Sequence, residues 1–147
     1  LQALAPARRE RVLEVGTGSG YFAACLAHLT GSVDSLEIRA ELAAGAASAI
    51  REQGIAGVSI ETADALVRAY EPAYEIVAVT GSLPSPERRL EYALVVSGRM
   101  FAVIGSGPAM HACLVTRTGE DSWLREPLFE TRIGPLVLPS EPSRFRF

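Results

Sequence analysis

The sequence contains no lysine and no asparagine, so all 14 of its positively charged side chains are arginines. Without lysine, the chain cannot use a lysine Schiff base or the lysine of a phosphate-binding P-loop. Cysteine is scarce as well: only Cys25 and Cys113 occur. Two cysteines argue against a disulfide framework and favour a reducing compartment, so we expect a cytoplasmic protein. Two cysteines and two scattered histidines do not form a zinc pattern, and we expect no metal site.

Long apolar runs and a strong charge of one sign are also missing. No run approaches the roughly 20 apolar residues of a membrane-spanning helix, and residues 1–10 are too short and arginine-rich for a secretory leader. The net charge of −3 and the pI of about 5.4 indicate no basic face for nucleic acid. We therefore expect neither a membrane nor a nucleic-acid partner. The 147 residues, 48% of them hydrophobic, are typical of one globular domain.

Strand-like and helix-like patterns alternate along most of the chain. The apolar patterns predict strands at 11–15, 33–38, 58–62, 74–80 and 99–104, and helices from 22 to about 31, at 41–53 and at 87–96. Two further strands, 112–118 and 122–130, follow with no helix between them, as in a hairpin. This order predicts an α/β fold: a mostly parallel sheet with helices on both faces and a C-terminal antiparallel hairpin. The tail 140–147 is predicted to be irregular, with Phe145 and Phe147 packed on the body.

A glycine-rich turn, Gly16-Thr17-Gly18-Ser19-Gly20, joins the first predicted strand to the first helix. Ligands of doubly wound sheets bind beyond the carboxyl ends of the strands, and glycines there permit positive φ and a close approach of the backbone. The N-terminus of the following helix adds unpaired N–H donors. The spacing is G-x-G-x-G, one residue short of the dinucleotide fingerprint, which disfavours an NAD-binding module. A plain tight turn is the alternative interpretation.

Glu14 lies two positions before the first glycine. A carboxylate there would repel a pyrophosphate but could receive a cationic amine. The combination of an acid with a glycine turn therefore suits S-adenosylmethionine (SAM), whose amino-acid end carries both an ammonium and a carboxylate group.

Two further acidic residues follow the next two predicted strands. Glu37 closes the second strand, where an acid accepts hydrogen bonds from ribose hydroxyls; its alternative role is that of a solvated carboxylate. Asp64 follows the third strand and could accept from an adenine amine, with the N–H of Ala65 serving a ring nitrogen. Asp64 could instead cap a helix over 65–69. Thr80 ends the fourth strand beside the same cleft.

Residues 12–21 (VLEVGTGSGY) closely resemble the first motif of the protein-L-isoaspartate O-methyltransferases, in which GTGSGY is characteristic. The similarity continues at 36–38, in the region of Asp64, and at 74–82, 98–103, 114–118 and 128–131, and it spans essentially the whole chain. The ending 142–147 resembles a bacterial branch of the family.

The resemblance implies a Rossmann-like, three-layer methyltransferase domain over residues 1–147, with SAM as its cofactor. It also implies an activity: esterification of the α-carboxylate of L-isoaspartyl residues in damaged proteins, so the partner would be an isoaspartyl protein or peptide. From the residues and the motif positions together, the predicted cofactor contacts are Glu14, Gly16, Thr17, Gly18, Ser19, Gly20, Glu37, Ile38, Asp64, Ala65 and Thr80.

The sequence departs from the family pattern at its start. Family members carry several dozen residues before this point, including a Ser/Thr-containing stretch that binds substrate, whereas this chain begins at Leu1 rather than Met. We expect that such a segment was removed. The acceptor carboxylate is already ionised near neutral pH, so the reaction needs no general base, and we assign no catalytic residue. A SAM-binding domain with lost or altered catalysis, acting as a sensor or interaction module, is the second hypothesis, and an oligomer is compatible with the sequence.

Overall fold

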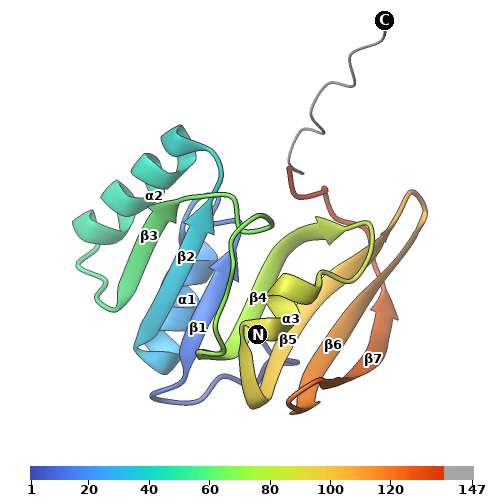
Figure 1. Cartoon of the computed structure of the whole chain (residues 1–147). Coiled ribbons are helices and arrows are strands. Elements are labelled where there is room, and N and C mark those ends of the chain that lie inside the picture. Colours follow the sequence, from blue (N-terminus) through green and yellow to red (C-terminus); the bar gives the residue numbers. More distant parts are fainter. Residues whose placement is uncertain (138–147) are drawn as a thin grey trace, which may run out of the picture.

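The computed structural model describes residues 1–137, so the predicted tail 140–147, with Phe145 and Phe147, lies outside the described residues. Within these residues, three helices and seven strands follow one another (Figure 1). In order they are β1 (Arg11–Val15), α1 (Tyr21–Thr30), β2 (Ser32–Glu37), α2 (Ala40–Glu52), β3 (Val58–Thr62), β4 (Tyr74–Leu83), α3 (Arg88–Tyr92), β5 (Leu94–Ser106), β6 (Ala109–Gly119) and β7 (Ser122–Glu130).

The seven strands form one sheet in the order β3-β2-β1-β4-β5-β6-β7. The first five strands of that order are parallel, whereas β6 is antiparallel to both β5 and β7. This arrangement confirms the predicted mostly parallel sheet with its C-terminal antiparallel hairpin. The chain moves outward from β1 to β3 and returns on the other side of β1 to form β4. The crevice between the ends of β1 and β4 is therefore the point at which ligands bind in such sheets.

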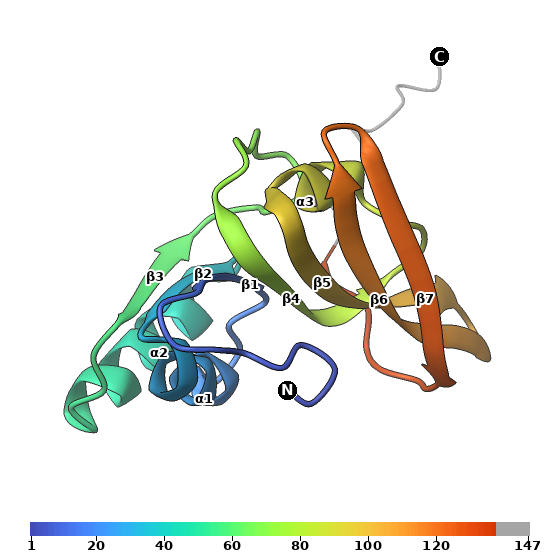
Figure 2. The same ribbon diagram turned by 90° about the horizontal axis from the view of Figure 1, so that it is seen from below.

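Helices α1 and α2 pack on one face of the sheet and α3 lies on the other, which gives three layers (Figure 2). The core on the first face joins Leu26 of α1 and Ile50 of α2 to Val12 and Val33 of the sheet. The opposite face is covered by Leu90 of α3, together with residues of the loop between β3 and β4. No helix among residues 1–137 is long and apolar enough to cross a membrane.

The predicted helix at 87–96 is wrong in its second half. Helix α3 ends at Tyr92, and Leu94 already pairs with β4, so Gly98 lies inside β5 and does not end a helix. The register of β4 against β5 shifts at this point, and a side chain at Gly98 would meet the carbonyl oxygens of Val95 and Tyr74 at 2.8 and 3.0 Å. Strand pairing across this bulge outweighs the helical spacing of the local sequence.

The alternative role of Asp64, as the cap of a helix over 65–69, is not seen. The Asp64 carboxylate accepts a hydrogen bond from the backbone N–H of Leu66 at 2.8 Å. The segment that follows forms a turn, so Asp64 holds a local turn and does not cap a helix.

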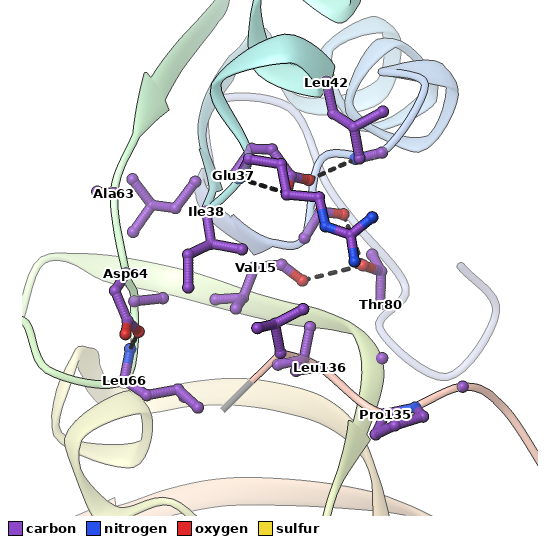
Figure 3. Close-up of a pocket in the computed structure, with 18 residues that line it drawn as sticks. Val15, Glu37, Ile38, Leu42, Ala63, Asp64, Leu66, Thr80, Pro135 and Leu136 are labelled. Carbon is purple, nitrogen blue, oxygen red and sulfur yellow. Dashed lines mark hydrogen bonds between the residues drawn. The ribbon is translucent and has the colours of Figure 1, made fainter. Parts of the chain in front are cut away.

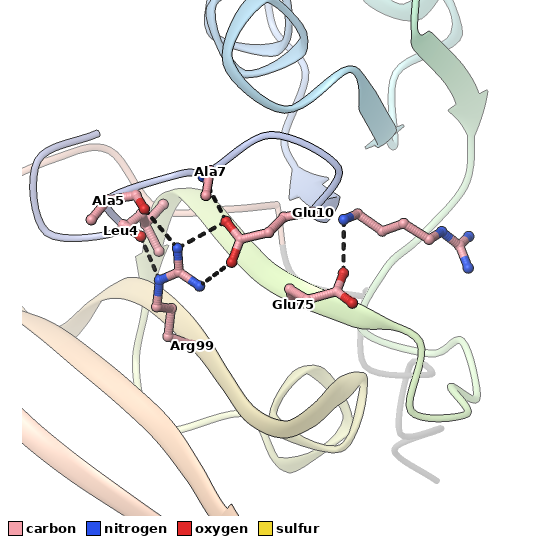
Figure 4. A network of polar contacts seen from close by, with 7 residues as sticks. Leu4, Ala5, Ala7, Glu10, Glu75 and Arg99 are labelled. Atoms are coloured by element: carbon pink, nitrogen blue, oxygen red, sulfur yellow. Dashed lines mark hydrogen bonds and ion pairs between the residues drawn. The ribbon is translucent and has the colours of Figure 1, made fainter.

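Arg99 of β5 anchors the N-terminal segment to the sheet (Figure 4). Its Nη1 and Nη2 atoms lie 2.8 and 3.0 Å from the two carboxylate oxygens of Glu10, and Nη2 donates to the carbonyl of Ala5 at 2.8 Å. Its Nε donates to the carbonyl of Leu4. The hydrogen bond from Arg99 lowers the pKa of Glu10 below its usual 4.5, against the opposing effect of burial. One guanidinium thus fixes the chain just before β1.

Candidate functional site

A cavity of about 350 Å³ opens at the carboxyl ends of the central parallel strands (Figure 3). Residues at or just after the ends of β1, β2 and β3 and residues in the C-terminal part of β4 line it, together with a segment that follows β7. They are Val15, Gly16, Gly18, Leu36, Glu37, Ile38, Arg39, Leu42, Ala63, Asp64, Ala65, Leu66, Thr80, Gly81, Gly134, Pro135, Leu136 and Val137. The volume is in the range of pockets that hold small molecules or cofactors.

The glycine turn has left-handed backbone at three positions, with φ of +93° at Gly16, +55° at Gly18 and +81° at Gly20. At Gly16 a side chain would collide with the hydroxyl of Thr80, so the turn can lie against β4 only as glycine. At Gly18 a side chain would meet open space, and both residues line the cavity. Gly20 instead packs against α2, where a side chain would come within 3.0 Å of the Ala46 Cβ atom.

Glu37 connects the end of β2 to the glycine turn. Its Oε2 accepts the N–H of Gly18 at 2.9 Å and its Oε1 accepts the N–H of Arg39 at 3.1 Å. An ionised carboxylate has about four acceptor positions, so two remain for a ligand. Glu37, Ile38 and Arg39 all line the cavity.

Asp64 and Ala65 form the part of the wall that follows β3. Asp64 uses Oδ1 for the N–H of Leu66, which leaves Oδ2 for a ligand. Ala65 is buried, and its carbonyl accepts a hydrogen bond from the Tyr70 hydroxyl at 3.0 Å. These two bonds give the loop a defined conformation beside the cavity.

Thr80 bridges β4 and the glycine turn. Its hydroxyl lies 2.9 Å from the carbonyl oxygen of Val15 and 2.6 Å from that of Gly16, and it donates its single hydrogen to this pair. Thr80 lines the cavity, although β4 does not end at Thr80 as predicted but continues to Leu83.

Glu14 lies below the turn, and its side chain is fully buried. The Ser35 hydroxyl donates to its Oε2 and lies 2.6 Å from the hydroxyl of Thr17. Burial raises the pKa of Glu14 from its usual 4.5 to about 7; the bond from Ser35 opposes this rise and the charge of Glu37 adds to it. Within the described residues, Glu14 Oε1 has no hydrogen-bond partner.

The structure thus brings seven of the predicted contacts to the cavity: Gly16, Gly18, Glu37, Ile38, Asp64, Ala65 and Thr80. The other four, Glu14, Thr17, Ser19 and Gly20, are not among the residues that line it. Ser19 is exposed at the start of α1, and its hydroxyl lies 3.4 Å from the backbone N–H of Tyr21. Direct contact between any of the eleven residues and a cofactor stays a prediction.

The sequence interpretation missed the wall formed by residues 134–137. After β7 this segment returns to the end of β4, where the N–H of Leu136 donates to the Ser82 carbonyl at 3.0 Å and the N–H of Ser82 to the Gly134 carbonyl at 2.9 Å. The Leu136 side chain then packs against Gly81 and Gly16 (Figure 3). The segment has no periodic pattern, so nothing in the local sequence indicates this position.

No group of three or more His, Cys, Asp or Glu side chains within residues 1–137 is arranged to hold a metal ion. Cys25 and Cys113 are both free and partly buried.

A family model described as protein-L-isoaspartate(D-aspartate) O-methyltransferase matches residues 1–139. Protein-L-isoaspartate O-methyltransferase 2 of Pelobacter propionicus is 36% identical over 138 residues, which are 92% of this chain and 61% of that protein. The protein-L-isoaspartate O-methyltransferase of Roseiflexus castenholzii is 34% identical over 139 residues, 93% of this chain and 63% of that protein. The chain therefore spans less than two thirds of the length of these curated relatives.

Solved structures that are also called protein-L-isoaspartate O-methyltransferases have the same fold as this chain. A putative protein-L-isoaspartate O-methyltransferase from Plasmodium falciparum, in complex with S-adenosyl-L-homocysteine, superposes with a TM-score of 0.79 at 18% identity, over 92% of this chain and 68% of that one. A second protein-L-isoaspartate O-methyltransferase gives a TM-score of 0.84 at 22% identity, over 92% of this chain and 44% of that one. At these identities the likeness shows the fold, and it confirms the Rossmann-like methyltransferase architecture.

Proposed function

This chain belongs to the protein-L-isoaspartate O-methyltransferase family, and from that premise we propose that residues 1–147 form the SAM-binding core domain of an enzyme that methylates L-isoaspartyl residues. The acceptor group is the α-carboxylate of the isoaspartyl residue in a damaged protein or peptide. The single observation that carries the proposal is the cavity at the β1–β4 crevice, where the glycine turn meets two carboxylates and a threonine. We place this activity in the cytoplasm.

The donor set around the cavity fits SAM. The spare acceptor positions of Glu37 suit the two ribose hydroxyls, and the free Oδ2 of Asp64 suits an adenine amine. Ala65 lies beside Asp64 with its backbone available to a ring nitrogen. The open space above Gly18 lets a ligand approach the backbone at the N-terminal end of α1. These four residues come from three different strand ends, which is what a nucleoside with an amino-acid tail requires.

When bound, SAM supplies a methyl group activated by its positive sulfonium. The acceptor carboxylate is already ionised near neutral pH, because free carboxyl groups titrate near pH 4. The protein therefore needs to align the two reactants and to limit water, and it needs no base. Leu136 supports the second task, since it packs over Gly16 and Gly81 at the edge of the cavity.

The test measures binding and transfer separately. Titration calorimetry with S-adenosylhomocysteine reports the cofactor site, and transfer of labelled methyl from SAM to an isoaspartyl peptide reports the activity. The same peptide with ordinary aspartate is the control substrate. We expect binding, transfer to the isoaspartyl peptide alone, and weaker binding by Glu37→Gln and Asp64→Ala. An exposed carboxylate away from the cavity, Glu52, provides the matched control Glu52→Gln.

The outcomes separate the hypotheses. Absence of S-adenosylhomocysteine binding would refute the cofactor assignment, and tighter binding of NADH would favour a dinucleotide module instead. Binding of S-adenosylhomocysteine without methyl transfer to any protein carboxylate would favour a sensor or interaction module. Transfer to the aspartyl control at the same rate would refute the isoaspartyl specificity.

A further inference from the structure

Three buried side chains under the glycine turn form a connected chain of hydrogen bonds. Thr17 belongs to the turn, Ser35 to β2 and Glu14 to β1, and their exposed fractions are 4%, 0% and 0%. Glu14 and Ser35 are paired neighbours across the two strands. Ser35 lies between the other two, bonded to Glu14 Oε2 on one side and 2.6 Å from Thr17 Oγ1 on the other.

The number of available hydrogen atoms determines the direction of the hydrogen bonds that link Thr17, Ser35 and Glu14. A hydroxyl group carries one hydrogen, and Ser35 donates its hydrogen to Glu14. Thr17 must therefore donate to Ser35, and Glu14 is the final acceptor. Removal of the Ser35 hydroxyl would leave a buried donor on Thr17 and a second unpartnered oxygen on Glu14, whose Oε1 already lacks a partner within the described residues.

The turn depends on such side-chain bonds because it has few others. Between Gly16 and Gly20, the N–H of Gly16 donates to the Leu36 carbonyl at 2.8 Å, the N–H of Gly20 donates to the Thr17 carbonyl at 2.9 Å, and the Gly20 carbonyl accepts the N–H of Ala24 at 3.0 Å. The N–H of Gly18 has Glu37 as its acceptor. Glu37 and Thr80 hold the turn through its backbone, whereas Thr17 provides the side chain of the turn that bonds the buried groups between β1 and β2.

From this geometry we propose that Ser35 is a positioning residue for the cofactor. Ser35 holds the Gly16–Gly20 turn in its ligand-binding conformation through Thr17, and buried Glu14 is the anchor of this link. The proposal rests on the proposed function. Ser35 does not line the ligand cavity, so its influence passes through the turn. Burial and the neighbouring Glu37 charge both raise the pKa of Glu14, and a neutral carboxyl under the turn avoids an uncompensated buried charge. Its Oε2 can accept the hydrogen of Ser35 in either protonation state, because a protonated carboxyl keeps acceptor capacity.

Ser35→Ala tests the link, with S-adenosylhomocysteine as the probe in calorimetry. We expect the dissociation constant to rise roughly tenfold, in line with the loss of a buried hydrogen-bonded partner. Ser35→Thr retains the hydroxyl and should restore most of the affinity. Thr30→Val is the matched control, because the Thr30 hydroxyl is equally buried but bonds the Leu26 carbonyl at the far end of α1. Thr30→Val should lower stability without changing the dissociation constant.

A second readout distinguishes positioning from a general loss of stability. The bond from Ser35 lowers the pKa of Glu14, so Ser35→Ala should move the pH dependence of urea stability toward higher pH, and Thr30→Val should not. If Ser35→Ala fails to fold, Thr17→Val removes the same link from the other end, retains the branched shape, and is judged by the same binding criterion.

Two negative results are distinguishable. If the unaltered protein binds no S-adenosylhomocysteine, the proposed function fails and this inference fails with it. If the unaltered protein binds and the folded Ser35→Ala or Thr17→Val variant binds equally well, the positioning role alone is refuted.

Discussion

The buried carboxyl of Glu14 makes stability depend on pH in an unusual direction. Its pKa of about 7 in the folded protein exceeds the usual 4.5 because burial disfavours the charge. Below pH 4.5 the group is protonated in both the folded and unfolded states, and its full contribution to stability is present. Between pH 4.5 and 7 the folded state binds more protons than the unfolded state, so stability falls as pH rises. Above pH 7 the contribution is lost.

The size of this effect follows from the pKa difference. At about 1.4 kcal/mol for each pH unit, the interval between a pKa of 4.5 and a pKa of about 7 corresponds to roughly 3 kcal/mol. That is a large part of the 5–15 kcal/mol by which a domain is typically stable. Glu14→Gln has nearly the same shape but carries no ionisable group, so its stability lacks this component. Relative to the unaltered protein, the variant should gain roughly 3 kcal/mol between pH 4.5 and pH 8.

Urea denaturation of both proteins at several pH values measures this difference directly. Taking the difference removes the titration of all other groups, including Glu10, whose pKa is shifted in the opposite direction. Glu71→Gln, which removes an exposed carboxylate, corrects for the change in net charge. A difference between Glu14→Gln and the unaltered protein that stays constant within about 1 kcal/mol over this range would refute the argument.

Two further predictions concern the turn and the N-terminal anchor. Gly16→Ala should destabilise the protein by about 1–3 kcal/mol, because it combines a positive φ with a collision against Thr80. The same substitution should weaken S-adenosylhomocysteine binding. The control Gly45→Ala lies in α2 with open space around it and should be neutral or stabilising by up to about 1 kcal/mol. Equal effects of the two substitutions in urea denaturation would contradict this. Arg99→Leu should cost about 2 kcal/mol by leaving Glu10 and two carbonyls without their partner. Because the pKa of Glu10 is lowered, the stabilisation from the Arg99–Glu10 pair is fully present above about pH 4.5 and is lost as pH falls through the lowered pKa. A Glu10→Gln variant whose stability depends on acidic pH in the same way as that of the unaltered protein would contradict this.

Local patterns in the sequence were sufficient for much of the fold. Strand β1 and strand β3 have the predicted bounds, and the other elements before Leu83 agree within a few residues, because each has its own apolar periodicity. The positions of Glu37, Asp64 and Thr80 at one edge also followed from the sequence. Parallel strands end on the same side of a sheet, so residues after successive strands converge there.

Other features were decided by contacts between distant parts of the chain. The bulge at Gly98 converts a helical pattern into strand because β4 offers backbone partners there. Leu136 reaches the cavity only because residues after β7 pair with Ser82. The sequence also does not indicate the side to which the Glu14 side chain points. The register of β1 on β2 places Glu14 against Ser35 under the glycine turn, and this strand pairing makes Glu14 a buried anchor that accepts a hydrogen bond from Ser35.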